Sequence, residues 1–151
     1  MTVNFDHARD DEQRRRMQRA LDTGECLLCR ENIERYHDRP ILLEGAYWLV
    51  TENAFPYEGA TLHHLVVYTR GHETDFRAIP PEAWTELQVL LSSVADTHGV
   101  SGGSLVMRFG DTKITGATLA HLHAHLIVGE PFADKRNESL RVKVGYKKAS
   151  G

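Results

Sequence analysis

The chain has 151 residues, of which 41% are hydrophobic, and its formal net charge is −3. This length and composition predict one compact domain over 1–151, and the charge argues against a general nucleic-acid-binding protein. No apolar stretch reaches the roughly 18 residues that a membrane span needs, and the start of the chain is polar, so we expect neither a membrane span nor a secretory signal and favour the cytoplasm.

The first half of the sequence predicts one helix and three strands. A charged helix is expected over 8–21, because Met17, Ala20 and Leu21 recur on one helical face and Gly24 follows them. The apolar runs after it, with the Gly and Pro residues between them, predict two short strands, a loop and a third strand over 41–43, 47–51, 53–59 and 65–68.

The second half predicts one long helix and two strands. The helix is expected over 81–98, where Pro81 and Glu82 suit the first turn and apolar residues recur at helical spacing. Apolar runs then predict strands over 105–107 and 120–128. The order of elements favours an α+β domain, in which flanking helices cover an antiparallel β-sheet.

Two segments of the second half carry weaker signals. The stretch over 110–118, between the two predicted strands, is expected to be a loop. The basic C-terminal tail over 141–151 contains Val142, Val144 and Tyr146, which alternate as in an edge strand.

The most informative feature of the sequence is a run of three histidines, His121, His123 and His125, at strict two-residue spacing. Side chains alternate between the two faces of a strand, so this spacing predicts all three imidazoles on one face. Leu122 and Ala124 then point to the opposite face, which suits a hydrophobic core.

One metal ion cannot easily bind all three histidines. On a regular strand, residues two apart are separated by about 6.6 Å and residues four apart by about 13 Å. Zinc–nitrogen bonds are only about 2.0–2.1 Å long. His121 and His123 can converge on one ion, whereas His121 and His125 can hardly do so. At least one histidine is therefore left for chemistry on a bound group.

The chain has two cysteines, Cys26 and Cys29, in a Cys-x-x-Cys motif. In a reducing cytosol a structural disulfide is not expected, and the βαβ pattern that accompanies thioredoxin-like redox pairs is not visible. Two cysteines at this spacing make half of a zinc site, and histidines are then needed for the other half.

These motifs resemble the histidine triad superfamily of nucleotide hydrolases and transferases, over about 26–130. His121-Leu-His123-Ala-His125-Leu-Ile matches the signature of alternating histidines. The resemblance also rests on four further segments: Gly116-Ala117-Thr118, Asn53-Ala54-Phe55-Pro56-Tyr57, His64-Leu65-Val66-Val67 and Arg70-Gly71-His72.

In a zinc-containing branch of this superfamily, Cys-x-x-Cys, a further histidine and the first triad histidine hold a zinc ion. The resemblance implies a closed, structural zinc site whose ligands here are Cys26, Cys29, His72 and His121. His63 and His64 are rival ligands. With His121 on zinc, His123 and His125 stay free.

The resemblance also implies the roles of the residues around a nucleotide. His123 is the expected nucleophile on the α-phosphorus, and His125 and Thr118 are expected to contact the phosphate or assist the leaving group. Backbone N–H groups around Gly116 are expected to offset charge that develops on the phosphate. The expected nucleotide-binding residues are Asn53, for the ribose hydroxyls, and His64, Arg108, Gly110 and Gly116.

Two features of the sequence depart from the family pattern. Many members carry Asn-x-Gly ahead of the triad, where this chain has Arg108-Phe109-Gly110 and a longer loop after it. Arg108 either binds phosphate through its charged fork or marks a different substrate. The connection from Pro56 to His64 is also longer.

We therefore expect a hydrolase that cleaves a nucleotidyl, preferably adenylyl, phosphoramidate or a dinucleoside polyphosphate through a nucleotidyl-histidine intermediate. The alternatives are a phosphorylase or nucleotidyltransferase, a nucleotide-binding module with little turnover, and a catalytic metal site on the triad. The third histidine, His125, favours hydrolysis or phosphorolysis over sugar-nucleotide transfer. The expected partners are a purine nucleotide or nucleotide conjugate and, by resemblance, a second copy in a homodimer.

Overall fold

The computed structural model describes residues 3–8, 10–57, 59–131 and 139–146. Its centre is a five-stranded antiparallel sheet with the strand order β1-β2-β3-β5-β4. The strands are β1 (Ile41–Glu44), β2 (Trp48–Glu52), β3 (Thr61–Thr69), β4 (Ser104–Arg108) and β5 (His123–Gly129). The predicted α+β class with an antiparallel sheet is confirmed.

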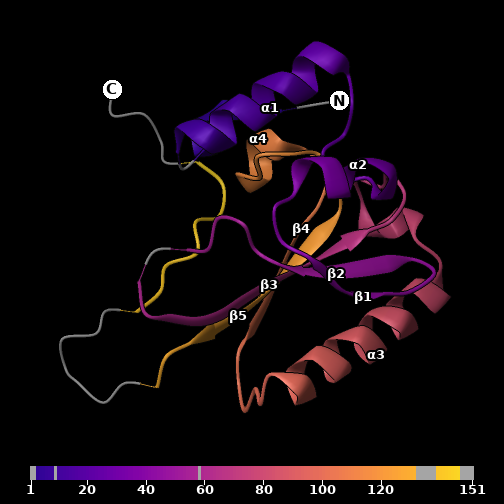
Figure 1. Ribbon diagram of the computed structural model, residues 1–151, viewed down its shortest axis with the longest axis vertical. Coiled ribbons are helices and arrows are strands. Elements are labelled where there is room, and N and C mark those ends of the chain that lie inside the picture. Colours follow the sequence, from indigo (N-terminus) through magenta and orange to yellow (C-terminus); the bar gives the residue numbers. More distant parts are fainter. Residues whose placement is uncertain (1–2, 9, 58, 132–138, 147–151) are drawn as a thin grey trace.

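Helices cover both sides of this sheet (Figure 1). The long helix α3 (Pro81–Thr97) lies on one side, and α1 (Asp11–Thr23), α2 (Arg30–Tyr36) and the single turn α4 (Thr112–Thr115) lie on the other. Two short 3-10 turns, η1 (Phe5–His7) and η2 (Phe76–Ala78), complete the set. None of the helices in the described ranges combines the length and the apolar character that a membrane crossing requires.

Alternation along the strands separates the main core from the opposite face. Leu65 and Val67 of β3 point toward α3, where the core consists of these two residues with Trp48, Val50, Leu87, Leu90, Val94, Leu122, Leu126 and Val128. Val66 and Tyr68 point the other way and pack with Ile33 of α2. Because His125 and His123 lie opposite Val66 and Tyr68 in the β3–β5 register, both histidines face the side of α1 and α2.

The prediction that all three histidines share one strand is wrong for His121. β5 begins at His123 rather than at residue 120, because the N–H of Leu122 donates to the carbonyl of Glu73 at 2.6 Å, outside the ladder. His121 therefore lies in the connection before β5, and its ring joins the two cysteines instead of the other two histidines.

Three further elements differ from expectation. The sequence did not predict α2, which is short and buries Asn32, Ile33 and Tyr36. The predicted loop over 110–118 contains α4, which Asp111 caps by accepting the N–H of Lys113. Over 139–146, which includes the described part of the tail, there is no edge strand, because the backbone bonds to a side chain and to a turn carbonyl and forms no ladder. The remainder of the predicted tail, 147–151, lies outside the described residues.

Candidate active site and metal centre

His123 and His125 lie next to each other in the middle of the sheet, with ring centroids 5.1 Å apart. They are 8% and 5% exposed. The register places His123 between Tyr68 of β3 and Arg108 of β4, so the Arg108 side chain lies on the same face as the His123 imidazole. The strands thus bring one cation next to two imidazoles.

The backbone fixes which nitrogen of His123 carries the proton. Nδ1 lies 2.6 Å from the carbonyl oxygen of His121, and because a carbonyl only accepts, Nδ1 is the protonated nitrogen. Nε2 therefore keeps its lone pair. Burial lowers the pKa of the His123 imidazole, and the nearby Arg108 charge lowers it further, so the neutral ring is favoured. A neutral imidazole with a free Nε2 lone pair is a competent nucleophile.

A second chain of contacts fixes the proton of His125. The backbone N–H of Tyr57 donates to Nδ1 of His64 at 3.2 Å, which leaves the His64 proton on Nε2. That Nε2 lies 2.8 Å from Nδ1 of His125 and donates to it. His125 is thereby assigned an N–H at Nε2. The two histidines of the pair are set up in opposite ways, one with a lone pair at Nε2 and the other with a proton there.

Two clefts open on this histidine pair, and His123, His125 and Thr118 line both of them. The inner cleft, of about 100 Å³, runs toward α1 and α2 and is mostly apolar and aromatic, with Leu28, Phe55, Val66 and Tyr68 among its lining residues. The outer cleft, of about 410 Å³, lies on the Arg108 side and is lined by charged residues of both signs: Asp6, Arg108, Arg141 and Lys143.

The other predicted nucleotide-binding residues do not all reach these clefts. Asn53 lines the inner cleft, where its side-chain oxygen accepts the N–H of Phe55 and its amide packs against the His64 ring. His64 lines neither cleft: it is 6% exposed and lies behind His125. Gly110 also lines neither, and its N–H donates to the carbonyl of Thr74.

The Gly116 amide, one of those expected to face a phosphate, is used inside a turn. Gly116 borders the outer cleft, but its N–H donates to the carbonyl of Thr112 at 2.9 Å and ends α4. The N–H of Ala117 likewise donates to Oγ1 of Thr115. These two amides are therefore occupied within the turn.

The four predicted metal ligands come together around the ring of His121, away from the pair His123 and His125. The ligand atoms of the four residues Cys26, Cys29, His72 and His121 all lie within 4.8 Å of one another. Sγ of Cys26 is 3.3 Å from Nδ1 of His121, Sγ of Cys29 is 3.7 Å from that same nitrogen, and Sγ of Cys29 is 3.5 Å from Nδ1 of His72. Ligands bonded at 2.0–2.3 Å to a tetrahedral ion lie about 3.3–3.8 Å apart, so this cluster has the dimensions of such a site.

The protonation of the cluster agrees with a metal centre. His121 donates from Nε2 to the carbonyl of Thr69 at 2.7 Å, which leaves the Nδ1 lone pair for the cysteine side. Burial lowers the pKa of His121 to about 4 and, together with the Cys26 thiol, raises the pKa of Cys29 to about 12. A bound cation reverses the second effect, because a coordinated thiol is deprotonated.

Several residues of the site were not singled out from the sequence. Tyr57 holds His64, and its ring lies 5.8 Å from that of His125, yet it entered the sequence analysis only as part of a motif. Thr69 holds His121. Arg141 and Lys143 reach the outer cleft from the tail, where the only sequence signal was a basic composition.

No protein-family model matches the sequence, and no curated protein is detectably similar to it. Solved structures do match the fold. An HIT family hydrolase from Clostridium thermocellum is 22% identical, with 74% of this chain and 96% of that one covered and a TM-score of 0.57. A zinc-bound histidine triad family protein from Mycobacterium smegmatis is 18% identical over 80% and 84%, with a TM-score of 0.56. A histidine triad nucleotide-binding protein from Candida albicans is 14% identical over 76% and 87%, also with a TM-score of 0.56.

Proposed function

We propose that this chain, which has the histidine triad fold, is a nucleotide hydrolase that forms a nucleotidyl-histidine intermediate on His123. The observation that carries the proposal is the His121 carbonyl bound to His123 Nδ1, which leaves Nε2 as a lone pair at the junction of two clefts. The substrate is a nucleotidyl, preferably adenylyl, group joined to a phosphate chain or to an amine.

The reaction takes place in two displacements. His123 Nε2 attacks the α-phosphorus, a nitrogen–phosphorus bond forms, and the bond to the leaving group breaks with its electron pair on the departing atom. His125 donates a hydrogen bond from its Nε2–H to that atom or to a phosphate oxygen and keeps the proton, and a departing amine takes its proton from solvent. Water then attacks the same phosphorus and releases one proton to solvent, the nitrogen–phosphorus bond breaks, and its electron pair returns to His123 Nε2 as the nucleoside monophosphate leaves.

The two clefts suit the two halves of such a substrate. The apolar and aromatic lining of the inner cleft, with Phe55 and Tyr68, suits a purine base, and Asn53 in the same cleft suits the ribose hydroxyls. Thr118, which lines both clefts, suits the α-phosphate between them. The leaving group then lies in the outer cleft.

We infer that the Cys26, Cys29, His72 and His121 cluster holds a structural zinc ion, because its donor set and its dimensions fit tetrahedral zinc. Bound zinc would supply a covalent link between the start of α2, the end of β3 and the start of β5. With four protein ligands it leaves no open position for substrate. His121 nevertheless serves the reaction, because its carbonyl orients His123.

Phosphorolysis is the second candidate. The outer cleft carries Arg108, Arg141 and Lys143, and this charge suits inorganic phosphate as the attacking group in the second displacement. Identifying the product distinguishes the two reactions: hydrolysis releases a nucleoside monophosphate, and phosphorolysis releases a nucleoside diphosphate.

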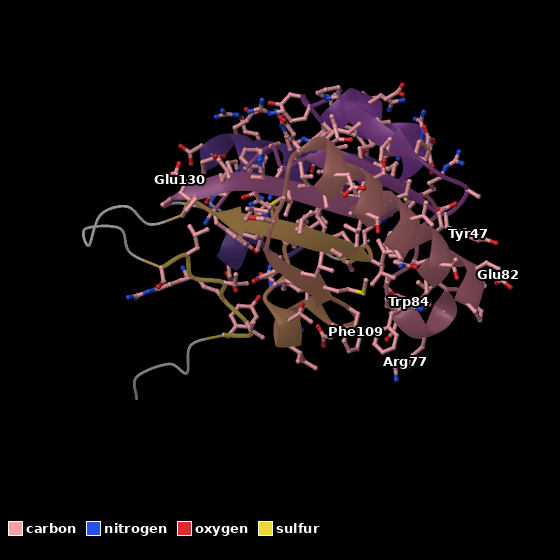
Figure 2. All side chains as sticks on the ribbon, turned by 90° about the horizontal axis from the view of Figure 1, so that it is seen from below. Tyr47, Arg77, Glu82, Trp84, Phe109 and Glu130 are labelled. Carbon is pink, nitrogen blue, oxygen red and sulfur yellow. The ribbon has the colours of Figure 1, made fainter. Side chains whose placement is uncertain are left out.

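We also infer that the protein forms a homodimer through β4. This strand is terminal in the sheet order, its Leu105 is 60% exposed, and Trp84 and Phe109 are each 42% exposed. Figure 2 shows Trp84 and Phe109 on one side of the molecule, and both rings contact Phe76. Light scattering of the purified protein tests this, and Leu105→Lys is expected to give monomers.

The reaction is tested by mixing the protein with adenylyl and guanylyl phosphoramidates and dinucleoside polyphosphates, quenching in milliseconds to seconds and measuring the intact protein mass. We expect a mass increase of one nucleoside monophosphate residue, lost in His123→Ala. Tight nucleotide binding without an adduct or turnover would identify a binding module instead.

A further inference from the structure

The described part of the tail, 139–146, forms one wall of the outer cleft. It is held at three places along its length. Leu140 packs against Gly59, so closely that a Cβ on Gly59 would lie 2.8 Å from its Cδ2. The carbonyl of Lys143 accepts a hydrogen bond from Arg108 Nη2 at 2.5 Å, and the N–H of Gly145 donates to the carbonyl of Thr115 at 3.1 Å. In Figure 1 this yellow segment runs from beside the outer end of β3 up to α1.

These contacts bring positive charge to the cleft from two directions. Arg108 comes from the sheet, where it pairs with His123, and Arg141 and Lys143 come from the tail. Asp6 is the acidic residue among those that line the cleft, so the cations are in excess.

Arg108 has a further unmet hydrogen-bonding capacity. Its Nη2 holds the tail, but its Nε is buried and has no hydrogen-bond partner among the described residues. A guanidinium has donors in a planar fork that matches two phosphate oxygens. A buried donor without a partner is costly, and an anion in the outer cleft would satisfy it.

We propose that the tail segment 139–146 builds an anion subsite for the leaving group, in which Arg141 and Lys143 act with Arg108. The substrate class that follows is a nucleotide joined to a further phosphate chain, such as a dinucleoside polyphosphate, in preference to one joined to an uncharged amine or alcohol. This inference rests on the proposed function, because it assigns the leaving group of that same reaction.

The subsite acts where charge develops. When His123 Nε2 bonds to the α-phosphorus, the bridging oxygen keeps the electron pair of the broken phosphorus–oxygen bond, and the departing phosphate chain gains one negative charge. The cations that the segment 139–146 and Arg108 supply contact that phosphate chain and not the nucleoside. They therefore stabilise departure of a phosphate chain and have little to offer a neutral leaving group.

The test compares two substrates that share an adenylyl group: diadenosine triphosphate and the p-nitrophenyl ester of AMP, whose leaving group carries a single charge at most. The variant is the double substitution Arg141→Ala and Lys143→Ala. We expect kcat/KM for diadenosine triphosphate to fall by about 10- to 100-fold and that for the ester to change less than about threefold. Arg141→Lys with Lys143→Arg should restore most of the loss.

The matched control is Arg39→Ala with Arg77→Ala, which removes the same charge from positions that do not line the outer cleft. It should leave both rates unchanged, and the melting temperature of every variant should stay near that of the natural chain. Equal losses on both substrates, or no loss on either, would overturn the anion subsite and leave the proposed function standing. Turnover of an adenylyl phosphoramidate but not of diadenosine triphosphate would also overturn the subsite alone, and no turnover of any of the three substrates by the natural chain would overturn both.

Discussion

His121 and His123 are two residues apart, yet they belong to two regions of opposite character. The Cys/His cluster around His121 gathers four candidate metal ligands, three of them buried, whereas His123 lines two clefts. What separates the two histidines is the ring nitrogen that carries the proton. The Thr69 carbonyl accepts a hydrogen bond from His121 Nε2–H, and the His121 carbonyl accepts one from His123 Nδ1–H.

The comparison shows that residue type and spacing do not decide the role of a histidine. The lone pair of His121 is left on Nδ1, close to the backbone and next to the cysteines. That of His123 is left on Nε2, at the far end of the ring. We infer that one carbonyl in each case makes the difference between the proposed ligand and the proposed nucleophile. Removing one side chain in each region should therefore give different failures.

The largest expected effect is that of His123→Ala. Turnover of an adenylyl substrate should fall by about 10⁴-fold or more, because the covalent route is lost. Zinc content and melting temperature should stay as in the natural chain, since the cluster does not include His123. Steady-state rates, elemental analysis and thermal unfolding measure the three quantities. If the variant turned over at a near-normal rate, the nucleophile would have to be assigned elsewhere.

Loss of the proposed metal should instead lower the stability of the protein. Cys26→Ser removes one ligand of a buried cluster, and loss of a structural metal belongs to the substitutions that cost about 4 kcal/mol or more. For a chain of this size that corresponds to a fall in melting temperature of about 8–16 °C. Elemental analysis should show less zinc.

The control for this prediction is a chelator. It should lower the melting temperature of the natural chain toward that of Cys26→Ser and change the variant little further. A natural chain that is purified without zinc at full stability would contradict the structural metal site.

The two cysteines and the histidine run are the part of the candidate site that a linear pattern reveals, whereas His72 was assigned by resemblance. Cys-x-x-Cys and His-x-His-x-His are local spacings, and the chemistry of thiolate and imidazole limits what they can bind. The order of strands and helices likewise follows from hydrophobic periodicity, which is strong in 81–98 and weak in the seven-residue α2. That is why α3 was predicted and α2 was not.

The remaining features depend on contacts that no local spacing encodes. The protonation of His123 depends on a carbonyl, and that of His125 depends on Tyr57 through His64, which lies 61 positions earlier in the chain. The tail reaches the outer cleft because Arg108 binds the carbonyl of Lys143, 35 positions away. The Gly116 amide looked free in the sequence because α4, which uses it, was not predicted.

A smaller effect on turnover is expected from substitution of His64, which lies behind His125. In His64→Ala the donor to His125 Nδ1 is lost, and His125 is no longer held in the tautomer with its proton on Nε2. We expect kcat to fall by about 10- to 100-fold for a poor leaving group, less for a good one such as p-nitrophenol, and KM to change little. His64→Gln keeps an N–H donor and should recover part of the rate. Equal losses on both leaving groups would argue for a purely structural role.

The smallest effect is expected at Thr69, the residue that holds His121. Its hydroxyl lies 3.1 Å from His121 Nε2, but the acceptor that sets the tautomer is its carbonyl at 2.7 Å, which no side-chain substitution removes. Thr69→Val keeps the shape of a buried side chain and removes a hydroxyl that bonds the Gly71 and Leu122 carbonyls. The cost should be about 1 kcal/mol, or about 2–4 °C in melting temperature.

Zinc affinity should fall by no more than about tenfold in Thr69→Val. Turnover by zinc-loaded Thr69→Val should be unchanged, because His123 is oriented by a different carbonyl. Competition with a chromogenic zinc chelator measures the affinity. Loss of zinc as complete as in Cys26→Ser would show that the hydroxyl, and not the backbone, decides which nitrogen of His121 faces the metal.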